Sequence, residues 1–179
     1  MIFTETKLAG AYLVELERNE DERGFFARNW SQREFAQRCL VSEFVESNIS
    51  FSKKKGTLRG MHYQAAPHGQ VKLVRCTAGA IFDVIIDLRR HSPTFKQWTS
   101  VELTALNHLM LYVPVDFAHG FQTLEDDTEV TYQVSSVYHP ESSTGIRWDD
   151  PAFGIPWPEG ERVIIARDRL YPDFIVSTS

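Results

Sequence analysis

The chain has 179 residues, of which 42% are hydrophobic, and its formal net charge is -5 at pH 7. A chain of this length can bury enough surface for one core, so we expect a single domain spanning residues 1–179. The acidic balance argues against a nucleic-acid binder, which needs an excess of Lys and Arg on one face.

No apolar run approaches the ~20 residues of a membrane span, and the first residues lack the pattern of a signal peptide. Cys39 and Cys76 are too few and too far apart to indicate a disulfide framework or a four-ligand zinc site. Because no disulfide framework is indicated, a reducing compartment is the default expectation for this protein. We therefore expect a cytoplasmic protein without a membrane partner.

Short runs rich in Val, Ile, Phe, Tyr and Thr recur along the chain, each closed by Gly, Pro, Asn or Asp. They span residues 11–16, 44–51, 57–64, 71–77, 80–88, 98–103, 109–113, 117–124 and 129–135. Short strands at this spacing indicate an all-β sandwich or barrel.

One helix is expected over residues 31–38, where Ser31 could cap the start and Glu34 lies three positions on, as in a capping box. Residues 139–158 differ from the rest, because they contain four prolines and two tryptophans. This composition predicts loops with one or two short turns that do not extend the sheet.

Polar residues alternate with apolar ones in several predicted strands. Lys72, His119 and Tyr132 each occupy the strand face that their apolar neighbours also occupy. Polar groups on the apolar faces of neighbouring strands predict a pocket inside a barrel, where a jelly roll commonly holds its ligand.

The segment Gly56-Thr-Leu-Arg-Gly-Met-His-Tyr-Gln64 places an Arg and a His three residues apart in one predicted strand. Alternation puts His62 on the face of Leu58 and Gln64, and Arg59 on the opposite face. Arg59 would join His62 only if Gly60 marks a β-bulge that redirects it.

His62 has the intrinsic pKa range of a general base, although a core or metal-ligand histidine is the alternative. Metal-binding jelly rolls use a His-x-His pair, a following Glu and a later His. Gln64 stands where the second His would be, residues 65–70 contain no Glu, and His119 alone matches the later His. We therefore expect no metal and no other cofactor at this site.

Lys72 and Tyr132 also have two interpretations each. An ammonium on an apolar face is costly unless it has a partner, so Lys72 could stabilise an oxygen that becomes negative during proton removal. Alternatively, it extends to solvent at the mouth of the barrel. Tyr132 could donate a proton from the side opposite His62, or it could be a core tyrosine with a satisfied hydroxyl.

Several sequence motifs occur in one order along nearly the whole chain. They include Asp21-Glu-Arg-Gly-Phe-Phe26, Leu58-Arg-Gly-Met-His-Tyr-Gln64, Lys72-Leu-Val-Arg-Cys76, Pro114-Val-Asp-Phe-Ala-His-Gly-Phe121, Trp148-Asp-Asp-Pro151 and Arg167-Asp168. Together they resemble the dTDP-4-dehydrorhamnose 3,5-epimerase family. The resemblance implies an all-β, cupin-like jelly-roll barrel with one or two short helices.

The resemblance also implies roles for individual residues. His62 would be the base, paired with the carboxylate of Asp168. Tyr132 would be the acid on the other face of the sugar, and Lys72 would steady the enolate. Substrate-binding positions are matched by Arg23, Arg59, His119, Tyr138 and Arg167, several of which would hold the diphosphate and sugar oxygens. We add the hypothesis that Asp83 orients His119.

Three positions depart from the family pattern. Arg28 replaces an acidic residue, Asn48 lies in Glu-Ser-Asn where the family often has Gln-x-Asn, and Ser143 replaces a Glu. The family uses all three around the nucleotide. The resemblance therefore supports the chemistry better than the identity of the base.

The sequence thus predicts a metal-free epimerase that inverts C3, C5 or both in a nucleotide-diphosphate 4-keto-6-deoxy sugar, in deoxysugar biosynthesis of the rhamnose type. The family pairs subunits by exchanging N-terminal strands, so we expect a homodimer in which residues near Arg23 complete the neighbour's site. The alternatives are a metal-dependent cupin enzyme and a non-catalytic nucleotide-sugar binding module.

Overall fold

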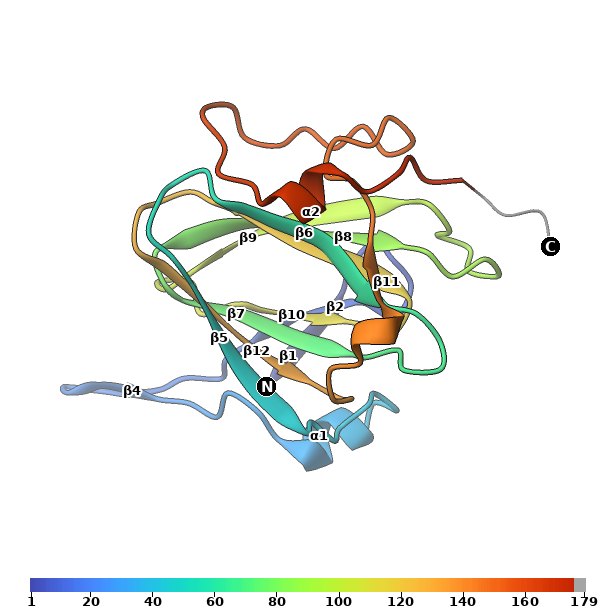
Figure 1. The fold of residues 1–179 in the computed structure, drawn as a ribbon. Helices are drawn as coiled ribbons and strands as arrows, with labels where there is room; N and C mark the ends of the chain where they lie inside the picture. Colours follow the sequence, from blue (N-terminus) through green and yellow to red (C-terminus); the bar gives the residue numbers. More distant parts are fainter. Residues whose placement is uncertain (176–179) are drawn as a thin grey trace.

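The computed structural model describes residues 1–175, whose two large antiparallel sheets face each other (Figure 1). In spatial order the six-stranded sheet contains β1 (Ile2–Glu5), β2 (Tyr12–Glu15), β10 (Met110–Val113), β7 (Lys72–Ala78), β12 (Thr128–Val134) and β5 (Glu46–Ser52). The five-stranded sheet contains β13 (Ser143–Gly145), β6 (Leu58–Gln64), β11 (Phe117–Thr123), β8 (Ala80–Asp87) and β9 (Trp98–Thr104). The prediction of an all-β, cupin-like jelly roll is confirmed.

All nine strands expected from the sequence are present, with ends within about two residues of the predicted ones. The strands that escaped prediction are short. Besides β1, they include β3 (Asn19–Asp21) and β4 (Gly24–Phe26), which form a hairpin. This hairpin projects away from the two sheets (Figure 1).

The prediction that residues 139–158 do not extend the sheet is wrong at one place. A 3₁₀-helix, Pro140–Ser142, is followed by β13, which pairs with the edge of β6 so that Gly145 faces His62. The three residues of β13 include no proline, so their backbone N–H groups remain available for an edge pairing. The remaining part of this stretch forms loops and turns.

Among the described residues, two short α-helices flank the barrel. Helix α1 (Gln32–Ala36) has Ser31 as its N-cap, and the side chain of Ser31 accepts a hydrogen bond from the N–H of Glu34 at 3.4 Å. The reciprocal half of the predicted capping box is missing, because the Glu34 carboxylate instead accepts from the N-terminal ammonium of Met1 at 2.9 Å. Helix α2 (Ala166–Arg169) carries Asp168.

Apolar side chains form an inner cluster and two outer clusters. The inner cluster includes Val74, Ile85 and Phe121, and Tyr132 packs against it. On the five-stranded sheet, the loops after β13 cover an outer cluster with Phe153 and Trp157, whereas Phe35 of α1 and its neighbours cover the six-stranded sheet. Within residues 1–175, no helix has the length and apolar composition needed to cross a bilayer.

Candidate active site

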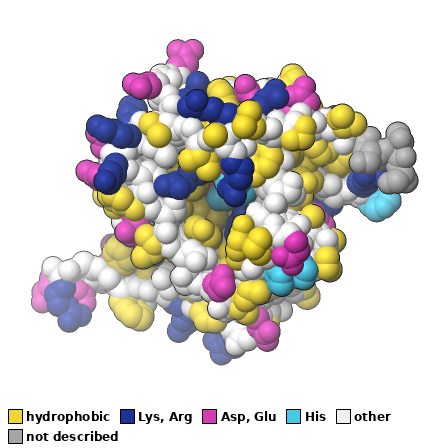
Figure 2. Space-filling model, viewed as in Figure 1, with side chains coloured by type: hydrophobic (Ala, Val, Ile, Leu, Met, Phe, Trp, Pro, Cys, Tyr) yellow, Lys and Arg dark blue, Asp and Glu magenta, His cyan; other side chains and the backbone are white. Residues whose placement is uncertain are grey.

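A cavity of about 410 Å³ opens between the two sheets. Figure 2 shows the hollow in the middle of this face, with Lys and Arg side chains around it and a histidine within it. Nine of the twelve predicted site residues line the cavity: Arg59, His62, Lys72, His119, Tyr132, Tyr138, Ser143, Arg167 and Asp168.

A β-bulge in β6 brings Arg59 to the same cavity as His62. His119 of β11 pairs with His62, and Phe121, two residues on, pairs with Arg59, three residues back on β6. Gly60 has a φ of +141°, which favours glycine. A Cβ atom on Gly60 would also lie 2.5 Å from the Cα atom of Gly120.

The bulge corrects one expectation from the sequence. Leu58 pairs with Gln122, so its side chain lies on the strand face opposite His62 and packs with Met61 in the outer cluster, although Leu58 also borders the cavity. The extra residue shifts the alternation by one position, so residues before and after Gly60 follow different parities.

Asp168 holds His62 through a short hydrogen bond. The Nε2 atom of His62 lies 2.8 Å from Oδ1 of Asp168, and the backbone N–H of Gly60 donates to Oδ2 at 3.2 Å. Burial opposes the charge on the carboxyl group, but the hydrogen bond from His62 keeps the pKa of Asp168 below its ordinary value. An ionised carboxylate accepts only, so Nε2 carries the proton and Nδ1 is the basic nitrogen.

The environment keeps His62 neutral near physiological pH. Burial lowers the pKa of His62 below its ordinary value, and the charges of Lys72 and Arg167 act in the same direction, while Asp168 opposes them. A guanidinium nitrogen of Arg167 lies 3.2 Å from Nε2. Because both atoms are donors, Arg167 acts on the ring through its charge and not as a hydrogen-bond partner. A neutral imidazole can accept a proton.

Lys72 reaches from β7 toward the opposite sheet, where its Nζ atom donates to the backbone oxygen of His62 at 3.3 Å. Burial lowers the pKa of Lys72 to about 8, and the charge of Asp83 opposes this shift. The ammonium is therefore mostly protonated at neutral pH. A cation in this position can stabilise negative charge that develops on a bound carbonyl oxygen.

Tyr132 faces the cavity from the six-stranded sheet, whereas His62 faces it from the five-stranded sheet. The Tyr132 hydroxyl has no hydrogen-bond partner within residues 1–175. Burial raises the pKa of Tyr132, and the charge of Arg59 partly offsets that effect. The hydroxyl is therefore protonated at neutral pH and can donate.

His119 forms a second pair with a carboxylate. Its Nε2 atom lies 2.8 Å from Oδ1 of Asp83, which confirms the expected contact between these residues. Asp83 is fully buried, and its other carboxylate oxygen has no partner within the described chain. Its charge acts on Lys72, as described above, so the pair contributes to the electrostatics of the cavity.

Three predicted site residues lie outside the cavity. Arg23 is exposed at the end of the β3–β4 hairpin and pairs with Asp21. Arg28 is also exposed, and its guanidinium lies 3.3 Å from the Glu34 carboxylate. Asn48 is half-buried and pairs with Tyr132 across β5 and β12, on the strand face that it shares with the cavity-lining Ser50.

Gln64 also lines the cavity, and the sequence did not predict its structural role. Its buried side-chain amide donates to the backbone oxygens of His68 at 2.8 Å and Val137 at 3.1 Å, and accepts from the N–H of His139 at 2.6 Å. The sequence signal for this role was that alternation places Gln64 on the same strand face as His62. The amide fastens two loops at the rim of the cavity.

Sequence and structure comparisons show which known proteins the chain resembles. Residues 5–175 match the family model for dTDP-4-dehydrorhamnose 3,5-epimerase. A relative of that name from Sinorhizobium fredii is 43% identical over 159 residues, which cover 89% of this chain and 82% of the relative.

Two crystal structures of dTDP-4-dehydrorhamnose 3,5-epimerases are also similar. The Elizabethkingia anophelis enzyme has a TM-score of 0.94 and 37% identity, covering 97% of this chain and 96% of that one. The Bacillus anthracis enzyme, with TDP and PPi bound, has a TM-score of 0.92 and 40% identity, covering 97% and 99%. The chain therefore belongs to the dTDP-4-dehydrorhamnose 3,5-epimerase family.

Proposed function

We propose that the protein is an isomerase that inverts C3, C5 or both in a nucleotide-diphosphate 4-keto-6-deoxy sugar, with dTDP-4-dehydro-6-deoxyglucose as the expected substrate. The reaction belongs to deoxysugar biosynthesis of the rhamnose type. Membership of the family supports the reaction class, and the bound TDP of the Bacillus anthracis relative supports a thymidine nucleotide.

The chemistry rests on the acidity of hydrogens beside the 4-keto group. Nδ1 of His62 removes a proton from the carbon next to the carbonyl, and the electron pair moves onto the keto oxygen as an enolate. The ammonium of Lys72 stabilises that oxygen. Tyr132 then gives its hydroxyl proton to the opposite face of the same carbon. Solvent returns a proton to Tyr132 and takes one from His62, so the cycle balances.

The observation that carries this proposal is the placement of His62 and Tyr132 on facing sheets of one cavity. A sugar ring bound between the sheets would have the base on one face and the acid on the other. Arg59, His119 and Arg167 line the same cavity and offer donors for the diphosphate and sugar oxygens.

The direct test is incubation of the protein with the 4-keto sugar in heavy water. Deuterium should enter C5, C3 or both, and the product should have the inverted configuration at the labelled carbon. A protein that binds the nucleotide sugar but exchanges neither hydrogen would be a binding module, and the proposal would fail.

A chelation experiment distinguishes the proposed metal-free epimerase from a metal-dependent cupin enzyme. Proton transfer by His62 and charge stabilisation by Lys72 supply what a metal would otherwise provide. We expect dialysis against a chelator to leave kcat unchanged within error, measured beside an undialysed sample. Loss of turnover that one divalent ion restores would favour the metal-dependent alternative.

We further propose a homodimer in which the β3–β4 hairpin of one subunit completes the cavity of the other. Arg23 lies on this hairpin, away from its own chain's cavity. Phe25 and Phe26 on the same hairpin are exposed, as are Ile49 and Phe51 on the edge strand β5. Exposed apolar groups on an edge strand and a projecting hairpin suit contact with a second copy.

We also propose that the chain is a single domain that acts in the cytoplasm. The family match over residues 5–175 and the shared core between the sheets support a single domain over residues 1–179, of which 176–179 lie outside the described residues. Cys39 and Cys76 are both free thiols, which supports the cytoplasm as the site of action.

A further inference from the structure

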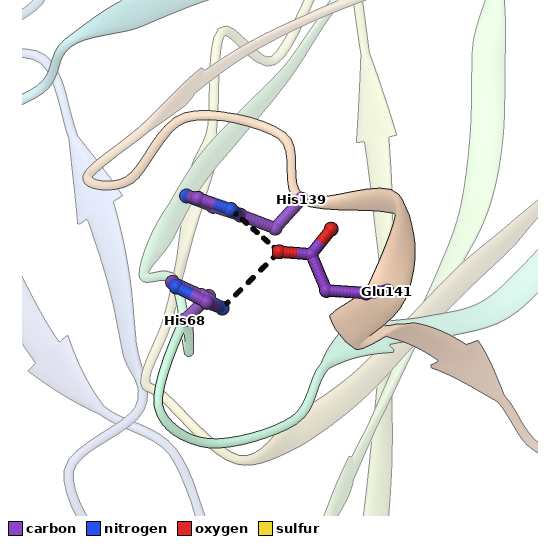
Figure 3. Close-up of side chains that lie close together, drawn as sticks. All are labelled: His68, His139 and Glu141. Carbon is purple, nitrogen blue, oxygen red and sulfur yellow. Dashed lines mark hydrogen bonds and ion pairs between the residues drawn. The ribbon is translucent and has the colours of Figure 1, made fainter.

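A second group of ligating side chains lies beside the cavity and has no part in the proposed reaction. His68 lies in the loop between β6 and β7, whereas His139 and Glu141 lie at the 3₁₀-helix before β13. Their ligating atoms all lie within 4.8 Å of one another (Figure 3).

The two imidazole rings stack face to face, with centroids 3.6 Å apart and 10° between their planes. Both direct a ring nitrogen toward the same carboxylate (Figure 3). Nδ1 of His139 lies 3.0 Å from Oε1 of Glu141, and Nδ1 of His68 lies 3.9 Å from that oxygen. An imidazole binds an ion in the plane of its ring, so the two parallel rings must turn apart before both nitrogens can reach one ion.

We propose that His68, His139 and Glu141 bind one divalent transition-metal ion, with Zn²⁺, Ni²⁺ and Co²⁺ as the fitting class. Two imidazole nitrogens and one carboxylate oxygen are ligands that these ions accept. With metal–ligand bonds of about 2.0–2.1 Å, neighbouring ligand atoms of a tetrahedral ion lie about 3.3 Å apart. The observed 3.0 and 3.9 Å separations are close to that spacing.

Side-chain rotations that open the stack complete the site. Nδ1 of His68 must exchange its 2.9 Å contact with the Ser142 hydroxyl for the ion. The Glu141 side chain is 64% exposed and both histidines are about 30% exposed, so the ion has an open route and room for water as a fourth ligand.

The backbone around the ligands is already fixed. The buried Gln64 amide bonds to the backbone of both His68 and His139, as described above, and so joins the two loops that carry the ligands. A backbone that is already held loses less conformational entropy when the ion binds. The ion would join the same two loops a second time, so binding should stabilise the folded chain.

The test is calorimetric titration of the tag-free full chain with Zn²⁺ and with Ni²⁺, slightly above neutral pH. We expect one ion per chain and a higher Tm. His68→Ala and His139→Ala should each weaken binding by ~10-fold or more, because even outer partners of ligands contribute that much. His91→Ala, at an exposed histidine elsewhere, is the matched control and should bind normally.

A second readout is thermal unfolding. Added Zn²⁺ should raise the Tm of the parent and of His91→Ala, and should raise it less in both alanine variants. The His68 and His139 variants should keep metal-free turnover, which makes this site independent of the epimerase reaction. The proposal is wrong if the protein binds no ion, if both alanine variants bind as well as the parent, or if His62→Asn or added dTDP abolishes binding.

Discussion

The imidazole of His62 and the carboxylate of Asp168 lie 2.8 Å apart although 106 positions separate them in the chain. Asp168 is buried on helix α2, and its second oxygen accepts from the backbone of Gly60 within the β6 bulge. The carboxylate is therefore held from two directions. It fixes the tautomer that leaves Nδ1 of His62 free to accept a proton.

Asp168→Asn should abolish most activity without unfolding the chain. An amide can donate to Nε2 of His62, which favours the tautomer with the proton on Nδ1 and removes the base. We expect kcat to fall by roughly 10²- to 10⁴-fold, which is the usual contribution of general-base catalysis. Steady-state kinetics and solvent deuterium exchange would measure the loss. Asp149→Asn, at an exposed carboxylate, is the control, and near-normal exchange in the Asp168 variant would contradict the assigned role.

Tyr132→Phe should separate proton removal from inversion. His62 and Lys72 remain intact, so the substrate can still lose a proton and regain one from the His62 side. The expected product is labelled in heavy water but keeps its configuration. Nuclear magnetic resonance of the sugar would follow both events. Parallel loss of exchange and inversion would show that Tyr132 is not a dedicated acid on the opposite face.

The pH profile of kcat/KM should be bell-shaped. Activity requires neutral His62, whose pKa lies below its ordinary value, so activity is lost as pH falls through that pKa. It also requires protonated Lys72, whose pKa is about 8, so activity is lost as pH rises through this value. Lys72→Arg, which stays charged throughout, should remove the basic limb from whatever activity it retains. A basic limb that persists in this variant would point to another group.

The sequence predicted most strands because each carries its own pattern of apolar residues and closing turn residues. Local patterns also placed Lys72 and Tyr132 on the cavity side, since the pairing of β7 with β12 is unbroken from Val130 to Val134. They failed at Leu58 because Gly60 inserts a residue into the β6 ladder. The bulge depends on the close approach of Gly120 from β11, which no local pattern reports.

Contacts between distant segments account for the other differences. The edge strand β13 forms only because β6 offers it a free edge, and three residues give too little pattern to predict a strand. The position of Arg23 depends on how the β3–β4 hairpin leaves the barrel. Family resemblance supplied the pairing of His62 with Asp168, which alternation within single strands cannot provide.

The proposed exchange of hairpins predicts complementation between two inactive variants. Arg23→Ala would keep His62 but offer a defective hairpin, and His62→Asn would keep Arg23 but lack the base. In a mixed dimer, one cavity combines the intact His62 with the intact hairpin, and the other has both defects. If subunits pair at random, half of the dimers are mixed, so co-expression should restore about a quarter of the parent activity per site.

The control is a mixture of His62→Asn with Asp168→Asn. Both positions lie in the same cavity of one chain, so no exchange of hairpins can rebuild an intact site within a mixed dimer. Activity should therefore stay at the level of the single variants. If Arg23→Ala alone is fully active, or if its mixture with His62→Asn gains nothing while mixed dimers are shown to form, Arg23 does not act across the interface. Its contact with Asp21 would then be a local feature of the hairpin.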